Sequence, residues 1–408
     1  MTENRAVRAA DGTLASCPCC GGDFGAPFYR TGLVPVHSCL MLDSAEAARA
    51  FPTGTLRLAA CRGCGFVANL DFDPRWSAYA PEYEDQQSFS PTFNSFAAGL
   101  ARDWIDRHGL VGKRAVEIGC SKGDFLALLA ELGGMETVGI DPSAVPGRVA
   151  RPSRGSMRLI QAYFGPDHLD LRADMIVCRH TLEHIRPVYE TLVMMRRMAE
   201  ATPGAVLCLE VPDATRLWRG AAFEDIYYEH CSYFTPGSLA RALRAAGFAV
   251  TGLRREYDDQ YLVAEAVLDP AQDRSFDIEE SPAEVLDWIA EFSARAPGVI
   301  DAWRNRIDSA REAGRRVAIW GSGSKCVAFL RMLDRTEAVD AIIDVNPHRA
   351  GRFAPGLGLP ISRPEKLMDL RPDLVVAMNR IYRPEIAAAL AEMGLAPDLV
   401  ALGEETDA

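Results

Sequence analysis

No stretch of this sequence is apolar over the roughly 20 residues that a membrane-spanning helix requires. The start, Met1 to Arg5, also lacks the apolar core of a secretory signal peptide. We therefore expect a cytoplasmic protein without membrane contacts. Positive charge is also scarce. The chain has 44 lysines and arginines but 56 aspartates and glutamates, which gives a net charge of −12. This balance argues against nucleic acid as the main partner, because phosphate binding favours a basic surface.

Cysteine is plentiful by comparison, with eleven in the chain. An odd number of cysteines without a signal peptide favours free thiols and metal ligands over disulfides. Two Cys-x-x-Cys pairs predict a structural Zn²⁺ site closed by four thiolates. The four predicted ligands are Cys17, Cys20, Cys61 and Cys64. Cys19, His37 and Cys39 leave the ligand set open, and buried or redox-active thiols are the alternative.

Apolar runs alternate with helical patterns over the rest of the chain, from a helix near 94–108 onward. The central strands that we expect span residues 115–118, 137–140, 158–162, 174–178 and 205–210. This alternation predicts an α/β fold with a parallel sheet, helices on both faces and ligands at the carboxyl ends of the strands. A second series from Arg316 predicts a smaller Rossmann-like sheet, after a helical stretch in which Pro297 is a candidate break.

The strand 115–118 runs into a turn with Gly119 and Gly123 and then into a helix. Such a turn gathers backbone N–H groups at a helix N-terminus and lets a cofactor approach the backbone closely. Asp141 ends the next strand, where an acid accepts hydrogen bonds from ribose hydroxyls. The spacing departs from Gly-x-Gly-x-x-Gly and resembles the S-adenosylmethionine loop of class I methyltransferases. The cofactor-binding residues that we predict are Glu117, Gly119, Cys120, Gly123, Phe125, Asp141 and His180.

Three of the seven histidines lie in two segments that follow strand ends, 179–185 and 225–236. Because histidine titrates near neutral pH, it can take and return a proton under cellular conditions. Zinc binding by His180, Glu183 and His184 is an alternative for the first segment.

A second glycine turn, Gly321-Ser-Gly-Ser-Lys325, precedes a helix and is too short for a Walker loop. Its N–H groups and its lysine are predicted to bind a phosphate of the substrate through Gly321, Gly323 and Lys325. A tight turn with a solvated lysine is the alternative.

The order of these motifs resembles the sugar C-methyltransferases, of which tetronitrose C-3-methyltransferase is the best-known type. The shared pieces include Ile-Tyr-x-Glu-His and the following Phe-Thr-Pro-Gly-Ser-Leu. The resemblance covers nearly the whole chain. It implies a zinc domain at 14–75, an S-adenosylmethionine domain at 76–270 and a Rossmann-like domain at 281–408 that helps to hold a nucleotide sugar.

The resemblance also implies roles for individual residues. His230 would be the general base, flanked by Tyr227 and Glu229. His184 and Tyr83 would face the substrate. A base beside a carbon next to a ketone can remove its proton, and the carbanion then attacks the sulfonium methyl group.

One hairpin departs from the family, whose members commonly carry a Gly-Gly pair and an arginine where this chain has Asp258-Asp259-Gln260. We predict that Asp259 and Gln260 line the substrate pocket and change the acceptor. The predicted function is an S-adenosylmethionine-dependent C-methyltransferase, a monomer or homodimer, acting on a small molecule such as a ketosugar nucleotide. The alternatives are an O- or N-methyltransferase and, in another class, a non-catalytic cofactor-binding partner protein.

Overall fold

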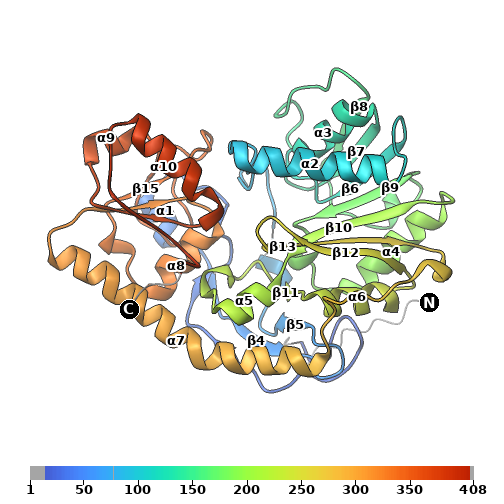
Figure 1. Ribbon diagram of the computed structural model, residues 1–408, viewed down its shortest axis with the longest axis horizontal. Helices are drawn as coiled ribbons and strands as arrows, with labels where there is room; N and C mark the ends of the chain where they lie inside the picture. The colour runs from blue at the N-terminus through green and yellow to red at the C-terminus, as the bar shows by residue number, and fades with distance from the viewer. Residues whose placement is uncertain (1–13, 77, 405–408) are drawn as a thin grey trace.

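The computed structural model describes residues 14–76 and 78–404 (Figure 1). Within these residues the strands form sheets of seven, five, four and two strands. None of the helices described is long and apolar enough to cross a bilayer.

The N-terminal part folds around an antiparallel sheet of order β1-β4-β5-β11. Its last strand, β11 (Ser232–Tyr233), comes from much later in the chain and pairs with β5 (Val67–Asn69). This small region is therefore tied directly to the central one. The other elements here are β1 (Tyr29–Arg30), β2 (Val34–Pro35), α1 (Ala45–Arg49), β3 (Thr53–Gly54) and β4 (Arg57–Ala60).

The central sheet has the order β12-β13-β10-β9-β6-β7-β8, with β13 antiparallel to both of its neighbours and the other pairs parallel. Its strands are β6 (Arg114–Ile118), β7 (Glu136–Ile140), β8 (Ser156–Ile160), β9 (Met175–Arg179), β10 (Val206–Pro212), β12 (Ala249–Glu256) and β13 (Tyr261–Val267). β8 begins two residues earlier than the predicted 158, where its pairing with β7 begins. β10 extends past the predicted end at 210, because β13 pairs with it as far as Pro212.

Helices cover both faces of this sheet, so the predicted α/β fold is confirmed (Figure 1). Trp104 and Phe125 lie in the core of one face, and Leu192 and Leu243 in that of the other. α2 begins before the predicted 94 because the hydroxyl of Ser90 caps it. These helices are α2 (Pro91–Arg107), α3 (Asp124–Gly133), α4 (Val188–Glu200), α5 (Ala214–Gly220) and α6 (Pro236–Ala245).

The C-terminal part is a parallel sheet of order β16-β15-β14-β17-β18, as the second Rossmann-like series predicts. Its strands are β14 (Val317–Trp320), β15 (Ala341–Ile343), β16 (Ile361–Ser362), β17 (Leu374–Ala377) and β18 (Asp398–Ala401). Its helices are α8 (Ser324–Leu333), α9 (Lys366–Leu370) and α10 (Arg383–Glu392).

One long helix, α7 (Pro282–Glu312), joins the central and C-terminal sheets along the lower edge of the molecule (Figure 1). It continues through Pro297, so the predicted break does not occur. Phe292, Ala296 and Trp303 are buried along it. Packing of this face on α5 and α8 offsets the hydrogen bond that a proline removes from a helix.

Candidate functional site

The glycine turn after β6 has a backbone that only glycine adopts easily. Gly119 has a φ of 73° and Gly123, which caps α3, a φ of 96°. A Cβ atom on Gly119 would lie 2.0 Å from Oγ1 of Thr181. The turn is therefore packed against the residue that follows β9, and its backbone forms one wall of a cavity.

Two buried atoms of opposite charge lie in the wall beside this turn. Oε2 of Glu117 and Nη2 of Arg179 have no hydrogen-bond partner among the described residues. Burial raises the pKa of Glu117 to about 8. Asp141 accepts hydrogen bonds from the backbone N–H groups of Ser121, at 2.8 Å, and Ser143, at 2.6 Å. A zwitterionic amino acid group and a ribose fit these residues, which is the chemistry of S-adenosylmethionine.

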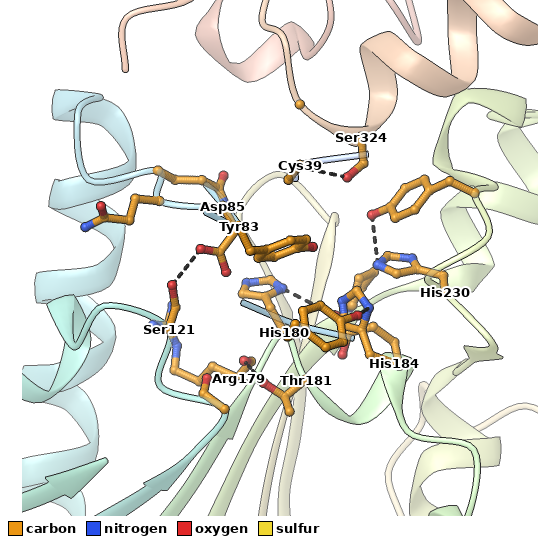
Figure 2. A pocket seen from close by; sticks show the side chains of 18 of the residues that line it. Cys39, Tyr83, Asp85, Ser121, Arg179, His180, Thr181, His184, His230 and Ser324 are labelled. Carbon is orange, nitrogen blue, oxygen red and sulfur yellow. Dashed lines mark hydrogen bonds and ion pairs between the residues drawn. The ribbon is translucent and has the colours of Figure 1, made fainter. Parts of the chain in front are cut away.

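The cavity has a volume of about 1120 Å³ and lies where the carboxyl edges of the central and C-terminal sheets meet (Figure 2). Pockets for one small ligand usually have about 300–1,000 Å³, so two ligands have room here. Most of the predicted site residues line it. They are Tyr83, Glu117, Gly119, Cys120, Phe125, Asp141, His180, His184, Tyr227, His230, Gln260, Gly321, Gly323 and Lys325.

His184 and His230 lie side by side in the cavity, with ring centroids 4.8 Å apart and an angle of 77° between the rings (Figure 2). The hydroxyl of Tyr227 lies 2.8 Å from Nε2 of His230, and that of Tyr79 lies 2.8 Å from Nδ1 of His184. Burial lowers the pKa of His184 to about 4 and that of His230 well below its usual value. Both imidazoles are therefore neutral and able to accept a proton or a metal ion.

Glu229 does not line the cavity, contrary to its predicted place beside the base. Its carboxylate accepts hydrogen bonds from the backbone N–H of Ser38, at 2.9 Å, and lies 3.0 Å from Nδ1 of His37. Burial alone would raise the pKa of Glu229, but His37 and Ser38 outweigh it and lower the pKa. Glu229 thus anchors the loop 37–39 beneath the site. His37 does not lie in the group of possible metal ligands that the four cysteines form.

Tyr79 is a site residue that sequence reasoning missed, and Glu183 is one that it named only as an alternative zinc ligand. Tyr79 was one of several aromatics in an irregular segment, and its contact with His184 depends on the fold of that segment. Glu183 is 2% exposed at the cavity wall, and neither of its carboxylate oxygens has a hydrogen-bond partner among the described residues. The Glu-His pair in the sequence was the only signal for it.

The second glycine turn, before α8, also reaches the cavity. Its lysine is neither solvated nor free, because Nζ of Lys325 lies 3.0 Å from Oδ1 of Asp225. Arg216 is paired with the other oxygen of the same carboxylate. Both cations line the cavity, so one aspartate is shared between two positive charges there.

The unusual hairpin turn between β12 and β13 is only partly in the site. Gln260 lines the cavity, and its Oε1 accepts a hydrogen bond from Nδ2 of Asn379 at 2.7 Å. Asp259 is exposed and does not line the cavity, so the structure does not bring it to the predicted substrate site. The reason is the turn itself, since Tyr257, Asp258 and Asp259 all have left-handed backbones that direct the acids outward.

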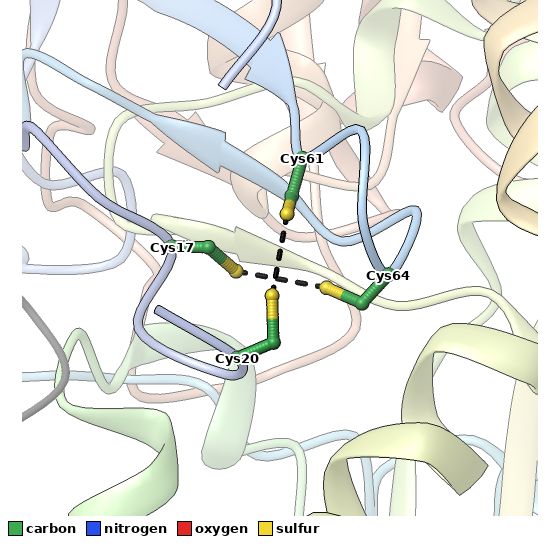
Figure 3. A group of neighbouring side chains, drawn as sticks. All are labelled: Cys17, Cys20, Cys61 and Cys64. Carbon is green, nitrogen blue, oxygen red and sulfur yellow. Dashed lines mark hydrogen bonds between the residues drawn. The ribbon is translucent and has the colours of Figure 1, made fainter. Parts of the chain in front are cut away.

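Four thiols from the two Cys-x-x-Cys pairs converge in the N-terminal region (Figure 3). Sγ of Cys17 lies 3.6 Å from that of Cys64, and Sγ of Cys20 lies 3.4 Å from that of Cys61. Cys39 is not among them and lies at the cavity, 3.5 Å from the hydroxyl of Ser324.

Comparisons with known proteins match most of the chain. The family described as "Methyltransferase domain" matches residues 93–253, and that described as "C-methyltransferase C-terminal domain" matches residues 276–396. The C-methyltransferase NovU of Streptomyces niveus is 25% identical over an alignment of 397 residues, and the match covers 91% of this chain and 91% of NovU.

Solved structures align with under half of the chain. The 1,6-didemethyltoxoflavin-N1-methyltransferase of Burkholderia thailandensis is 18% identical, covering 43% of this chain and 80% of its own, with a TM-score of 0.32. The glycopeptide N-methyltransferase MtfA is 15% identical, covering 43% of this chain and 96% of its own, also with a TM-score of 0.32.

Proposed function

The chain belongs to the S-adenosylmethionine-dependent C-methyltransferases, and from this premise we propose that it methylates a carbon next to the ketone of a nucleotide-linked sugar. The observation that carries the proposal is the position of His230, whose buried and neutral imidazole lines the cavity between the central and C-terminal sheets.

The cofactor supplies a methyl group on a positively charged sulfur. In our proposal Glu117 holds the ammonium group of the cofactor, Arg179 its carboxylate and Asp141 its ribose. The backbone of the turn at Gly119 lies against the cofactor. Oε2 of Glu117 and Nη2 of Arg179 support this assignment, because each has no hydrogen-bond partner among the described residues and would gain one from the bound cofactor.

His230 removes the proton from the acceptor carbon. We assign the proton of the neutral imidazole to Nε2, where it donates to the oxygen of Tyr227 at 2.8 Å, so that Nδ1 is free to take the proton. The enolate that forms needs a hydrogen-bond donor at its oxygen, and His184 and Tyr83 are the candidates on the same wall. Glu229 acts only as a positioning residue, through the loop of His37 and Ser38.

A nucleotide diphosphate suits the opposite wall of the cavity. Lys325 and Arg216 line the cavity and share one carboxylate, that of Asp225. The turn at Gly321 and Gly323 adds backbone N–H groups at the N-terminus of α8. Gln260 lines the same cavity and would contact the acceptor.

We also propose that Cys17, Cys20, Cys61 and Cys64 bind a structural Zn²⁺ ion. Thiolates on a tetrahedral zinc lie about 2.3 Å from the ion, and the observed sulfur separations of 3.4 and 3.6 Å suit such a site. Four cysteines leave no position for a substrate, so this metal would serve folding alone.

The test uses S-adenosylmethionine with a panel of nucleotide-linked ketosugars, and compares the wild type with His230→Ala. We expect His230→Ala to bind S-adenosylhomocysteine within about twofold of the wild type and to lose at least about 100-fold in methyl transfer. The product's carbon NMR spectrum places the new methyl group on carbon, oxygen or nitrogen. Unchanged turnover in His230→Ala, or a methyl group on oxygen or nitrogen, would refute the proposal, and cofactor binding without turnover on any acceptor would favour a non-catalytic partner protein.

A further inference from the structure

Glu183 is buried, and neither oxygen of its carboxyl group has a hydrogen-bond partner among the described residues. Nδ1 of His180 lies 3.8 Å from Oε1 of Glu183, but Nε2 of the same imidazole lies closer to another carboxylate, 2.7 Å from Oε1 of Glu210. An ionised carboxylate in such a place costs several kcal/mol unless a cation or a set of donors compensates it. Burial accordingly raises the pKa of Glu183 to about 7.

Two imidazoles stand beside this carboxylate. Ligand atoms of Glu183, His184 and His230 all lie within 4.8 Å of one another. Nδ1 of His184 and Nε2 of His230 are each held by a tyrosine hydroxyl, those of Tyr79 and Tyr227. A hydrogen bond on one ring nitrogen is the usual outer support of a metal-bound histidine, because it orients the other nitrogen toward the ion.

We propose that Glu183, His184 and His230 bind a divalent transition-metal ion, Zn²⁺ or Ni²⁺, at a site separate from the four cysteines. Two imidazoles and a carboxylate are a ligand set that these ions prefer, and it leaves coordination positions open toward the cavity. His180 is not in this group, and its Nε2 lies 2.7 Å from Oε1 of Glu210, so the set differs from the His180, Glu183 and His184 alternative.

The three ligand side chains must move closer together to bind the ion. Ligands about 2.0–2.1 Å from a tetrahedral ion are roughly 3.3 Å apart, so ligand atoms that lie within 4.8 Å of one another must approach by at most about 1.5 Å. All three side chains line the cavity, so they have space on one side to move.

Metal binding and proton abstraction compete for His230. An imidazole nitrogen bound to a metal has no lone pair for a proton, so the second equivalent of metal inhibits methyl transfer, and removing that equivalent alone restores it. This consequence rests on the proposed function, whereas binding of the metal itself does not.

The test is zinc K-edge X-ray absorption on the full chain with one and with two equivalents of Zn²⁺, without acceptor. We expect a sulfur shell at about 2.3 Å with the first equivalent and an added nitrogen and oxygen shell at about 2.0–2.1 Å with the second. Titration calorimetry with Zn²⁺ measures the second affinity, which we expect to fall at least tenfold in Glu183→Gln and in His230→Gln.

His180→Gln is the matched control, since it changes a neighbouring imidazole that is not a ligand, and it should keep the second site. Circular dichroism melts of all variants report whether each is folded. No nitrogen and oxygen shell with the second equivalent, or equal second affinity in the wild type and a folded Glu183→Gln variant, would overturn the proposal.

Discussion

Gly119 is the position in the cofactor loop that tolerates least change. Alanine there would need a left-handed backbone and would place a methyl group 2.0 Å from Oγ1 of Thr181. We expect Gly119→Ala to weaken S-adenosylhomocysteine binding at least about tenfold, measured by titration calorimetry.

The control for this change is Gly99, inside α2, where an added Cβ meets nothing within 4 Å and φ is not left-handed. Gly99→Ala should leave cofactor binding unchanged and raise the free energy of unfolding by about 0.5–1 kcal/mol. Equal cofactor affinity in both variants would mean that the loop does not contact the cofactor.

Individual residues of the site were predictable where they lie at the end of a strand that the sequence itself predicts. Glu117, Asp141 and His180 follow or end apolar runs, and the carboxyl ends of parallel strands meet at one edge. Lys325 shows the limit, since its partner Asp225 lies 100 residues away and no local pattern joins them.

At the scale of elements, α7 stands out because it contains a proline. Pro297 is exposed, removes one backbone hydrogen bond and crowds the carbonyl of Ser293. Pro297→Ala should therefore raise the free energy of unfolding by about 1–3 kcal/mol, as urea denaturation would show. Pro282→Ala, at the first turn of the same helix where proline is tolerated, should change it by less than about 1 kcal/mol. A loss of stability in Pro297→Ala would contradict this account.

A buried carboxylate joins α2 to the β12–β13 hairpin. Burial alone would raise the pKa of Glu265, but hydrogen bonds from His108 and Arg254 outweigh it and lower the pKa to about 2. Because the folded pKa lies below the usual 4.5, the ion pair stabilises the fold above pH 4.5 and is lost as the pH falls toward 2.

Glu265→Gln should accordingly be less stable than the wild type at pH 7, by on the order of 2–3 kcal/mol, and the gap should narrow as the pH falls from 5 to 3. Thermal melts across this range measure it. Glu337→Gln, whose side chain is 84% exposed, should follow the wild type at every pH. A stability difference between Glu265→Gln and the wild type that stays constant from pH 5 to 3 would show that the ionised carboxylate of Glu265 does not stabilise the fold.

Elements with a continuous apolar run were predictable, and their ends were not. Pairing with β13 extends β10, and packing of Phe292 and Trp303 holds α7 straight through its proline. Both are tertiary effects that a local pattern does not contain. The pairing of β11 with β5 belongs to the same class.

At the scale of the whole molecule, the cysteine region and the proposed base share one sheet. β11 follows directly after His230, and the backbone N–H of Asn69 donates to the carbonyl of Cys231 at 3.0 Å. If the four cysteines hold zinc as proposed, we expect its removal by a strong chelator to abolish methyl transfer while leaving S-adenosylhomocysteine binding within about threefold.

Hydrogen exchange checks this expectation. Protection should fall in 57–69 and 230–234 after chelation and persist in 114–141, where the cofactor loop lies. Equal loss across all three segments would mean global unfolding and would contradict local coupling.

The same strand pairing affects how the chain is made. β5 leaves the ribosome with one free edge, and its neighbour β11 is synthesised roughly 160 residues later. At about 5–20 residues per second, that edge stays unpaired for roughly 8–30 seconds. An exposed edge strand invites pairing with other chains, so zinc captured early by Cys17 to Cys64 would keep the nascent segment compact until the strand that completes its sheet arrives.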